Sequence, residues 1–223
     1  MTSLRQYIRG ILLTEGMKTE ADLPDGIGII IRSRAWGDNP SNTVISYYNL
    51  NTKYPLETDR ENVIPWGMVS LGLVYPYEPA YNGQDERFNL PEDTSNLTCG
   101  NAFQIFTTDA SDGWGPLLYD VAIEWATMNG NGLISDRSGV SEEAQAVWEE
   151  YMYNRPDVQK FQCDDHLNTL TATLDDNVDM NIPMADDRLY FPEDLENDPL
   201  GKRYTKEPTT INALKADARL VML

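Results

Sequence analysis

Two glycines and a proline stand directly ahead of an apolar helical pattern in residues 109–126, DASDGWGPLLYDVAIEWA. Glycine permits a tight turn and a close approach of a ligand to the backbone, and the first N–H groups of a helix attract anions. The amides around Gly113 and Gly115 could therefore cradle a phosphate or pyrophosphate group. The same residues could instead form a tight turn that only starts the helix, so the spacing alone leaves both interpretations open.

Alternating strand and helix patterns surround this turn. Residues 101–110 favour a strand, a helix starts at Pro116, NGNG ends it, and residues 132–137 favour a second strand. Ser141 is a suitable N-cap for the next helix, which Pro156 stops. The expected buried faces are Leu117, Leu118, Val121, Ala122, Trp125 and Met128 in the first helix, with Asp120 and Glu124 outside them, and Ala144, Val147, Trp148, Tyr151 and Met152 in the second. This order predicts a βαβ unit.

The remaining chain divides by composition. Residues 4–12 have helical spacing, residues 27–36, 43–50 and 67–77 read as strands of one sheet, and residues 76–99 read as a long loop. Residues 157–198 hold ten aspartates and two glutamates against one lysine and one arginine. Composition predicts a mostly irregular acidic extension over residues 157–223. It packs on its own domain or lies along a neighbouring subunit.

Charge limits the partners. The 223 residues carry 36 Asp and Glu against 17 Lys and Arg, a formal net charge of −19. Such a surface repels nucleic acid and anionic membranes, so we expect neither as a ligand and expect protein partners with basic surfaces. Two cysteines are too few for a disulfide framework, and the first residues are too charged for a signal peptide, so we expect a cytoplasmic protein.

Metal and hydrolase chemistry find little support. His166, the single histidine, lies beside Cys163, Asp164 and Asp165, and neighbours so close in sequence seldom converge on one ion. Residues 175–181, DDNVDMN, resemble the start of a calcium loop, but Met180 stands where an EF-hand requires glycine. We therefore expect no metal site and no Ser-His-Asp triad.

Residues 99–165, with their order of strand, glycine turn, helix, strand and helix, resemble the acetyl-coenzyme-A-binding half of the GNAT superfamily of N-acetyltransferases. The run GWGPLLYDVAIEWAT, GLISDR, VWEEYMYNRPDVQ and DD resembles, more narrowly, GNAT-related proteins encoded by tailed bacteriophages. The resemblance implies an α/β (α+β) fold with a GNAT-like central mixed sheet flanked by helices. It implies a GNAT-like domain over residues 1–156, whose coenzyme-binding half spans about residues 99–156, and acetyl-coenzyme A as a possible cofactor.

The resemblance also implies binding residues. In the family, the loop Gln/Arg-x-x-Gly-x-Gly/Ala cradles the coenzyme pyrophosphate with backbone amides. Carried over, coenzyme binding falls on Gly113, Trp114, Gly115 and Leu117. Arg137 and Arg155 are near enough in sequence to offset the negative charge of Asp109 and Asp112. Pro116 has no amide to donate, Ala110 replaces the leading Gln or Arg, and Asp109 and Asp112 oppose a polyanion.

Catalysis departs from the family further. Many GNAT enzymes protonate the departing thiolate with a tyrosine on the helix that follows the second strand, and the register places Trp148 there. Tyr151 and Tyr153 remain the catalytic candidates, although Tyr151 lies on the expected buried face.

Two functions of different classes follow. One is a virion-associated structural or adaptor protein on a GNAT-like fold with degenerate catalytic features, made in the host cytoplasm. The other is an acetyl-coenzyme-A-dependent N-acetyltransferase acting on a cationic amine such as lysine or a polyamine. The departures at Ala110 and Trp148 favour the first.

Overall fold

The computed structural model describes residues 17–36, 39–52, 66–73, 102–135, 140–163, 170 and 196–223, with the backbone alone for 34–36 and 39–42. The strands are β1 (Ile27–Trp36), β2 (Asn39–Asn49), β3 (Gly67–Leu73), β4 (Phe103–Ala110), β5 (Leu133–Ile134), β6 (Val158–Gln162), β7 (Lys202–Lys206) and β8 (Leu220–Met222). The described α-helices are α2 (Gly115–Asn129), α3 (Glu142–Tyr153) and α5 (Thr209–Ala216), and two short 3₁₀ turns are η1 (Glu20–Asp22) and η2 (Pro199–Gly201).

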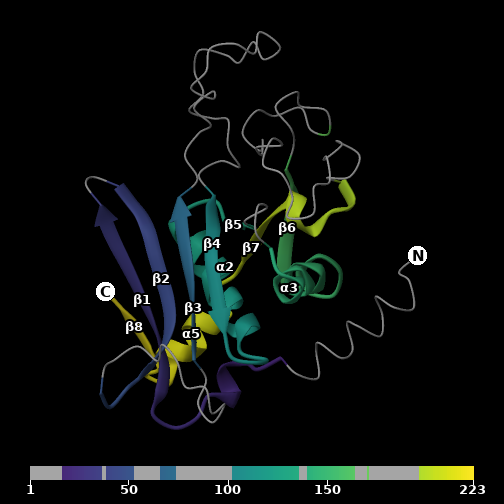
Figure 1. The fold of residues 1–223 in the computed structure, drawn as a ribbon. Helices are drawn as coiled ribbons and strands as arrows, with labels where there is room; N and C mark the ends of the chain where they lie inside the picture. Colours follow the sequence, from purple (N-terminus) through teal and green to yellow (C-terminus); the bar gives the residue numbers. More distant parts are fainter. Residues whose placement is uncertain are drawn as a thin grey trace.

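All eight strands belong to one curled, mixed sheet in the order β6-β7-β5-β4-β3-β2-β1-β8 (Figure 1). The strands β1 to β4 are antiparallel neighbours, β4 and β5 are parallel, and β7 is antiparallel to both β5 and β6. The molecule is therefore a mixed α/β protein, as the sequence predicted. The strands expected at residues 27–36, 43–50 and 67–77 are confirmed as β1, β2 and β3 in their described parts.

The βαβ unit is confirmed as β4, α2 and β5. Pro116 occupies the first turn of α2, and the Oγ atom of Ser141 accepts a hydrogen bond from the amide of Ala144 at 3.2 Å, as expected for an N-cap. A parallel pair needs a crossover connection, and α2 supplies it by packing against the sheet. Because α2 and α3 follow parallel strands, their N-termini lie near the same end of that pair.

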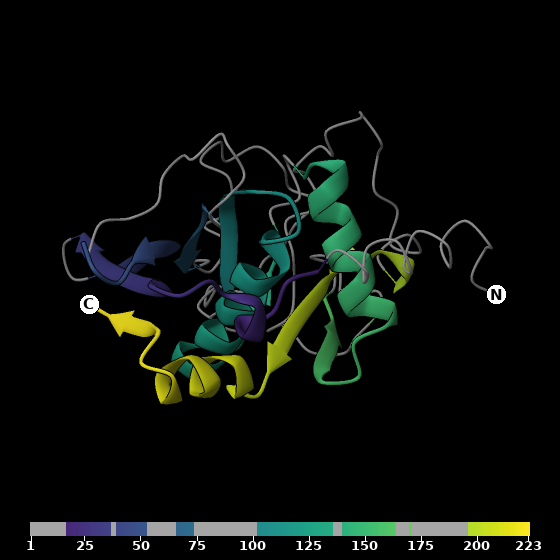
Figure 2. The same ribbon diagram turned by 90° about the horizontal axis from the view of Figure 1, so that it is seen from below.

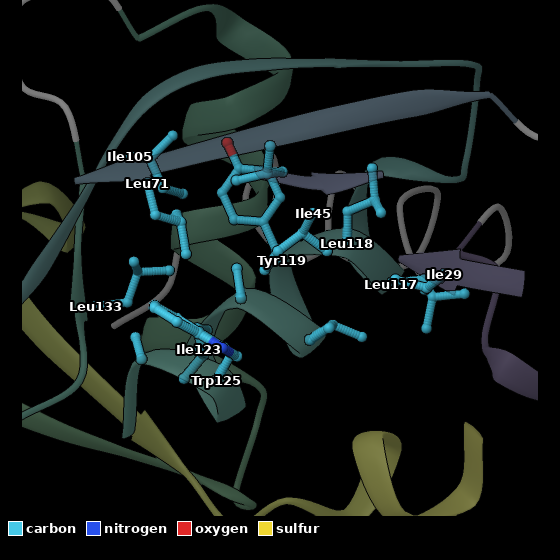
Figure 3. Close-up of a cluster of buried hydrophobic side chains, with 14 of the residues drawn as sticks. Ile29, Ile45, Leu71, Ile105, Leu117, Leu118, Tyr119, Ile123, Trp125 and Leu133 are labelled. Carbon is cyan, nitrogen blue, oxygen red and sulfur yellow. The ribbon is translucent and has the colours of Figure 1, made fainter. Parts of the chain in front are cut away.

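α2 forms the centre of the hydrophobic core. It contacts the strands β2 to β5 and β7 on one side and α5 on another, so it is buried on most sides (Figure 2). Figure 3 shows Leu117, Leu118, Tyr119, Ile123 and Trp125 of α2 among Ile29, Ile45, Leu71, Ile105 and Leu133 of the strands. Each side chain of this size contributes about 1.5–3 kcal/mol when it leaves water.

The buried part of α2 is wider than expected, since Tyr119, Ile123 and Ala126 are buried too, and two residues lie on the side opposite to the one predicted. Glu124, predicted to lie outside the buried stripe, is 0% exposed, whereas Met128, predicted to lie in it, is 48% exposed. Burial of an unpaired charge costs free energy, so a charged side chain is buried when a partner compensates its charge. Lys206 of β7 and the start of α5 provide that compensation, and a sequence pattern within α2 alone could not reveal partners some 80 residues away.

The described parts of residues 157–223 differ from the irregular extension that composition predicted. β6 and β7 pair at one end of the sheet, α5 packs on α2, and β8 pairs with β1 at the other end. The side chains of Lys202, Tyr204 and Lys206 alternate inward along β7. Two of these three buried residues are lysines, so the period-two pattern does not show as an apolar one. The sheet thus runs across the boundary that we expected at residue 156.

Several predictions fall outside the described residues: the helix over residues 4–12, the loop over 76–99, Arg137, His166 and the acidic run 175–181. In the described part of the chain, no helix has the length and apolar character needed to cross a membrane.

Candidate functional site

The glycine turn between β4 and α2 is held from three sides. Gly113 has a φ of +78°, a conformation that side chains rarely adopt, so glycine is needed there. The amide of Lys18 donates to the carbonyl of Gly113 at 3.0 Å, and the hydroxyl of Tyr47 donates to the carbonyl of Trp114 at 2.7 Å. The amide of Ser111 donates to the carbonyl of Trp66 at 3.0 Å. The turn is therefore a defined structure and not a loose connection.

A cavity of about 520 Å³ opens beside this turn. Its walls come from Met17, the end of β4, the turn, the first residues of α2 and the first residues of α3. The lining residues are Met17, Thr108, Asp109, Ala110, Ser111, Asp112, Gly113, Gly115, Pro116, Tyr119, Ser141, Glu143, Ala144 and Val147. Ligands in α/β proteins bind outside the carboxyl ends of strands, and this cavity lies at the carboxyl end of β4. It is the candidate functional site.

Backbone donors at this site face no acceptor among the residues that the structure describes. The amides of Gly113, Gly115 and Leu117 form no hydrogen bond with another described residue, whereas the amide of Trp114 donates to the carbonyl of Ser111 at 3.0 Å. A Cβ atom added to Gly115 meets nothing within 4 Å, so the backbone there borders open space. Gly113 and Gly115 can thus offer donors to a ligand, as the sequence interpretation requires.

Carboxylates dominate the charge of the cavity. Asp109 and Asp112 are exposed, line the cavity and form no ion pair with a described residue, and Glu143 lines it too. No Lys, Arg or His occurs among the described lining residues, and the cation nearest along the chain, Lys18, does not line the cavity. A helix N-terminus acts as about half a positive charge, which two full negative charges outweigh. The described part of the cavity lining therefore opposes a polyanion.

The floor of the cavity carries two hydroxyl groups. Tyr119 is 3% exposed, and burial raises the pKa of its phenol, so it keeps its proton at neutral pH. The Oγ1 atom of Thr108 is itself buried and completes no hydrogen bond within the described structure. A ligand that fills the cavity could supply the missing partner.

Both tyrosines that were candidate general acids lie away from the cavity lining. The Tyr151 hydroxyl donates to the Oδ1 atom of Asp120 at 2.7 Å and lies 3.3 Å from the Pro116 carbonyl. Burial raises the pKa of Tyr151, and the Asp120 carboxylate raises it further. Tyr153 is 48% exposed, and its hydroxyl reaches the carbonyl of Asn197 at 3.3 Å. Neither residue is placed to protonate a group in the cavity.

The side chain of Trp148, in α3, packs against α2 and β7. Its ring lies edge to face with Tyr119 of α2, with centroids 5.4 Å apart, and stacks on Tyr204 of β7 at 5.0 Å. Its side chain is 1% exposed. The residue that takes the register of the family's acid is thus a core aromatic residue with no titratable proton near neutral pH.

A second polar cluster is buried beneath α2 and has its own partners. The ammonium group of Lys206 pairs with the Glu124 carboxylate and donates to the Oγ1 atom of Thr210 at 2.8 Å. The amides of Thr210 and Ile211, at the start of α5, donate to Glu124 at 2.9 and 2.7 Å. The polar groups of this cluster satisfy one another, so the cluster is a structural network.

The sequence located part of the site. Gly113 and Gly115 line the cavity, but Trp114 packs against the core with Tyr47, and Leu117 is 2% exposed and belongs to the core. Sequence reasoning placed the strand that ends at Thr108 beside the ligand but missed Tyr119 and the start of α3 as lining residues. The signal was present, because two helices that follow parallel strands bring their N-termini to the same end of the sheet.

The described residues do not fit the cofactor that the resemblance implies. The amides at Gly113 and Gly115 suit a pyrophosphate, but Asp109 and Asp112 oppose it without a compensating cation in the described lining. Within the part of the chain that the structure describes, no group of three or more His, Cys, Asp or Glu residues could hold a metal ion.

No family model, curated protein or solved structure matches this chain.

Proposed function

We propose that this chain is a GNAT-like protein of a tailed bacteriophage that acts as a non-catalytic structural or adaptor protein in the virion. The observation that carries the proposal is the pair Asp109 and Asp112, which line the cavity at the glycine turn where the described lining holds no cation. A parallel β4 and β5 pair joined by a helix that begins at a glycine turn supports the GNAT-like part of the proposal.

The positions of Tyr151 and Tyr153 support the part of the proposal that the protein is not a catalyst. Tyr151 is buried and hydrogen-bonded to Asp120, and Tyr153 lies outside the cavity lining. Acid catalysis requires a proton donor within hydrogen-bond reach of the leaving group. The proposal includes synthesis in the host cytoplasm. It also includes protein partners with basic surfaces, because the chain carries a formal net charge of −19.

The alternative is an active N-acetyltransferase that uses acetyl-coenzyme A and modifies a cationic amine. The amides of Gly113 and Gly115, which donate to no described acceptor, and the cavity beside them favour this alternative. The negative lining would then attract the amine and oppose the coenzyme.

Calorimetric titration of acetyl-coenzyme A separates the two functions. We expect no binding at coenzyme concentrations up to about 1 mM. A site with a dissociation constant in the micromolar range would be saturated at that concentration. Binding in the micromolar range that Gly115→Glu abolishes and Gly115→Ala retains would establish the enzyme instead. The two substitutions are a matched pair because space is open beside Gly115, so only the glutamate blocks and charges the cavity.

A second measurement tests the virion role. If the chain is a structural component, mass spectrometry detects it in purified phage particles after high-salt washing. Its absence from the particles would contradict that role.

A further inference from the structure

The backbone of β4 is open along the side that borders the cavity. β5 pairs with β4 at only two positions, Phe103 with Leu133 and Gln104 with Ile134. Beyond them, Ile105 and residues 107–110 pair with β3 on one side, and the whole stretch 105–110 has no strand partner on the other side in the described structure. Thr108, Asp109 and Ala110 of this open edge line the cavity. An unpaired strand edge is a template for a further extended chain.

The turn that follows β4 adds donors to this edge. The amides of Gly113 and Gly115 donate to no acceptor within the described residues, and the buried Thr108 hydroxyl completes no hydrogen bond there. Acceptor atoms from a ligand would satisfy these groups. The carbonyl oxygens of an extended peptide supply such acceptors without adding negative charge.

The carboxylates select the side chains of that peptide. Asp109 and Asp112 border the same cavity and have no described cation beside them. A peptide with lysine or arginine at alternate positions brings carbonyl acceptors and positive charge together, whereas a phosphate ligand brings acceptors with negative charge. The volume of about 520 Å³ accommodates a few residues of an extended chain.

We propose that this cavity binds an extended, basic segment of another protein, which adds to the open edge of β4 as a strand and places its cationic side chains near Asp109 and Asp112. The inference rests on the proposed adaptor function and names its partner by chemistry. The backbone of the segment pairs with β4, and its positive charges determine which segments bind.

Fluorescence anisotropy with a labelled ten-residue peptide of alternating lysine and threonine tests the inference. We expect saturable binding at low salt that weakens about tenfold in the double variant Asp109→Asn/Asp112→Asn, because two charge attractions are lost. The control double variant Asp25→Asn/Asp217→Asn removes the same charge from exposed positions that do not line the cavity, and its affinity should change less than twofold.

A second peptide tests the strand pairing. The same sequence with alternate backbone amides N-methylated keeps every positive charge but loses the donors that pair with β4, so its affinity should fall about tenfold. Equal loss of affinity in both double variants would overturn the inference, because it would mean nonspecific charge attraction. Equal binding of the methylated peptide, or no binding up to 1 mM, would overturn it as well.

Acetyl-coenzyme A, added as a competitor in the same assay, separates the two proposals. Displacement of the peptide by micromolar coenzyme would contradict the proposed adaptor function. Absence of peptide binding together with absence of coenzyme binding would contradict only the inference about the partner.

Discussion

The helices α5 and α2 begin in opposite ways. At the start of α5, the amides of Thr210 and Ile211 donate to the carboxylate of Glu124, which is 0% exposed. At the start of α2, the amides of Gly113 and Gly115 donate to no described residue and border a cavity. At the start of α5, a carboxylate of the chain itself accepts the free amides. At the start of α2, the amides stay open, and the carboxylates that line the cavity repel an anionic ligand.

The buried start of α5 should produce the largest effect when it is broken. Lys206→Met leaves the Glu124 carboxylate buried without its cation, and we expect the free energy of unfolding to fall by about 3–5 kcal/mol in urea titrations. The double variant Glu124→Leu/Lys206→Met removes both charges and should lose less than the single variant.

Lys215→Met is the matched control, because Lys215 is an exposed residue at the other end of α5. It should change the free energy of unfolding by about 0.5 kcal/mol or less. A loss below about 1 kcal/mol in Lys206→Met would mean that the ion pair does not hold α5 on α2.

The open start of α2 depends on a hydroxyl from α3. Tyr151→Phe removes the hydrogen bond to Asp120 and the contact with the carbonyl of Pro116, so we expect a loss of about 1.5–3 kcal/mol in the free energy of unfolding. Tyr153→Phe, at a half-exposed position on the same helix, should lose about 0.5 kcal/mol or less in the same urea titration. Similar losses in both variants would show that Tyr151 does not position the start of α2.

The sequence predicted the local parts of this comparison. The glycine turn, the N-cap at Ser141 and the βαβ unit follow from residue types within a few positions of each other, and the structure confirms them. Tyr151 as a core residue was also readable from helical spacing, since its side chain is 1% exposed. These features depend on local backbone preferences and on one period of the helix.

Long-range partners could not be predicted in the same way. Glu124 is a surface residue by the pattern of α2, and only Lys206 and the start of α5 explain its burial. β7 was hidden because its inward positions include Lys202 and Lys206, which composition counts as polar. The cavity could not be predicted from either strand alone. It depends on the separation of β5 from β4 after two paired positions, which is a property of the sheet.

A single exposed carboxylate connects the two helix starts and should produce the smallest effect. Asp157 accepts hydrogen bonds from Arg155 at 2.7 and 2.8 Å and lies 3.9 Å from Lys206, while Arg155 also donates to Asp120 at 3.0 Å. The hydrogen bonds from Arg155 lower the pKa of Asp157. A lowered pKa in the folded state stabilises the protein above the unfolded value of about 4 and is lost as the pH falls through the folded value.

Asp157→Asn removes this contribution, so the wild type should be more stable than the variant by a constant amount above about pH 5, and the difference should shrink below about pH 4. The side chain is 47% exposed, so solvent limits the difference to about 1 kcal/mol or less, and high salt should reduce it. Urea titrations between pH 3 and pH 7 measure it, with Asp217→Asn as the control substitution at an exposed aspartate. If the stability difference between the wild type and Asp157→Asn grew as the pH fell, the charges around Asp157 would not stabilise its carboxylate. Asp157 would then not connect the two helix starts.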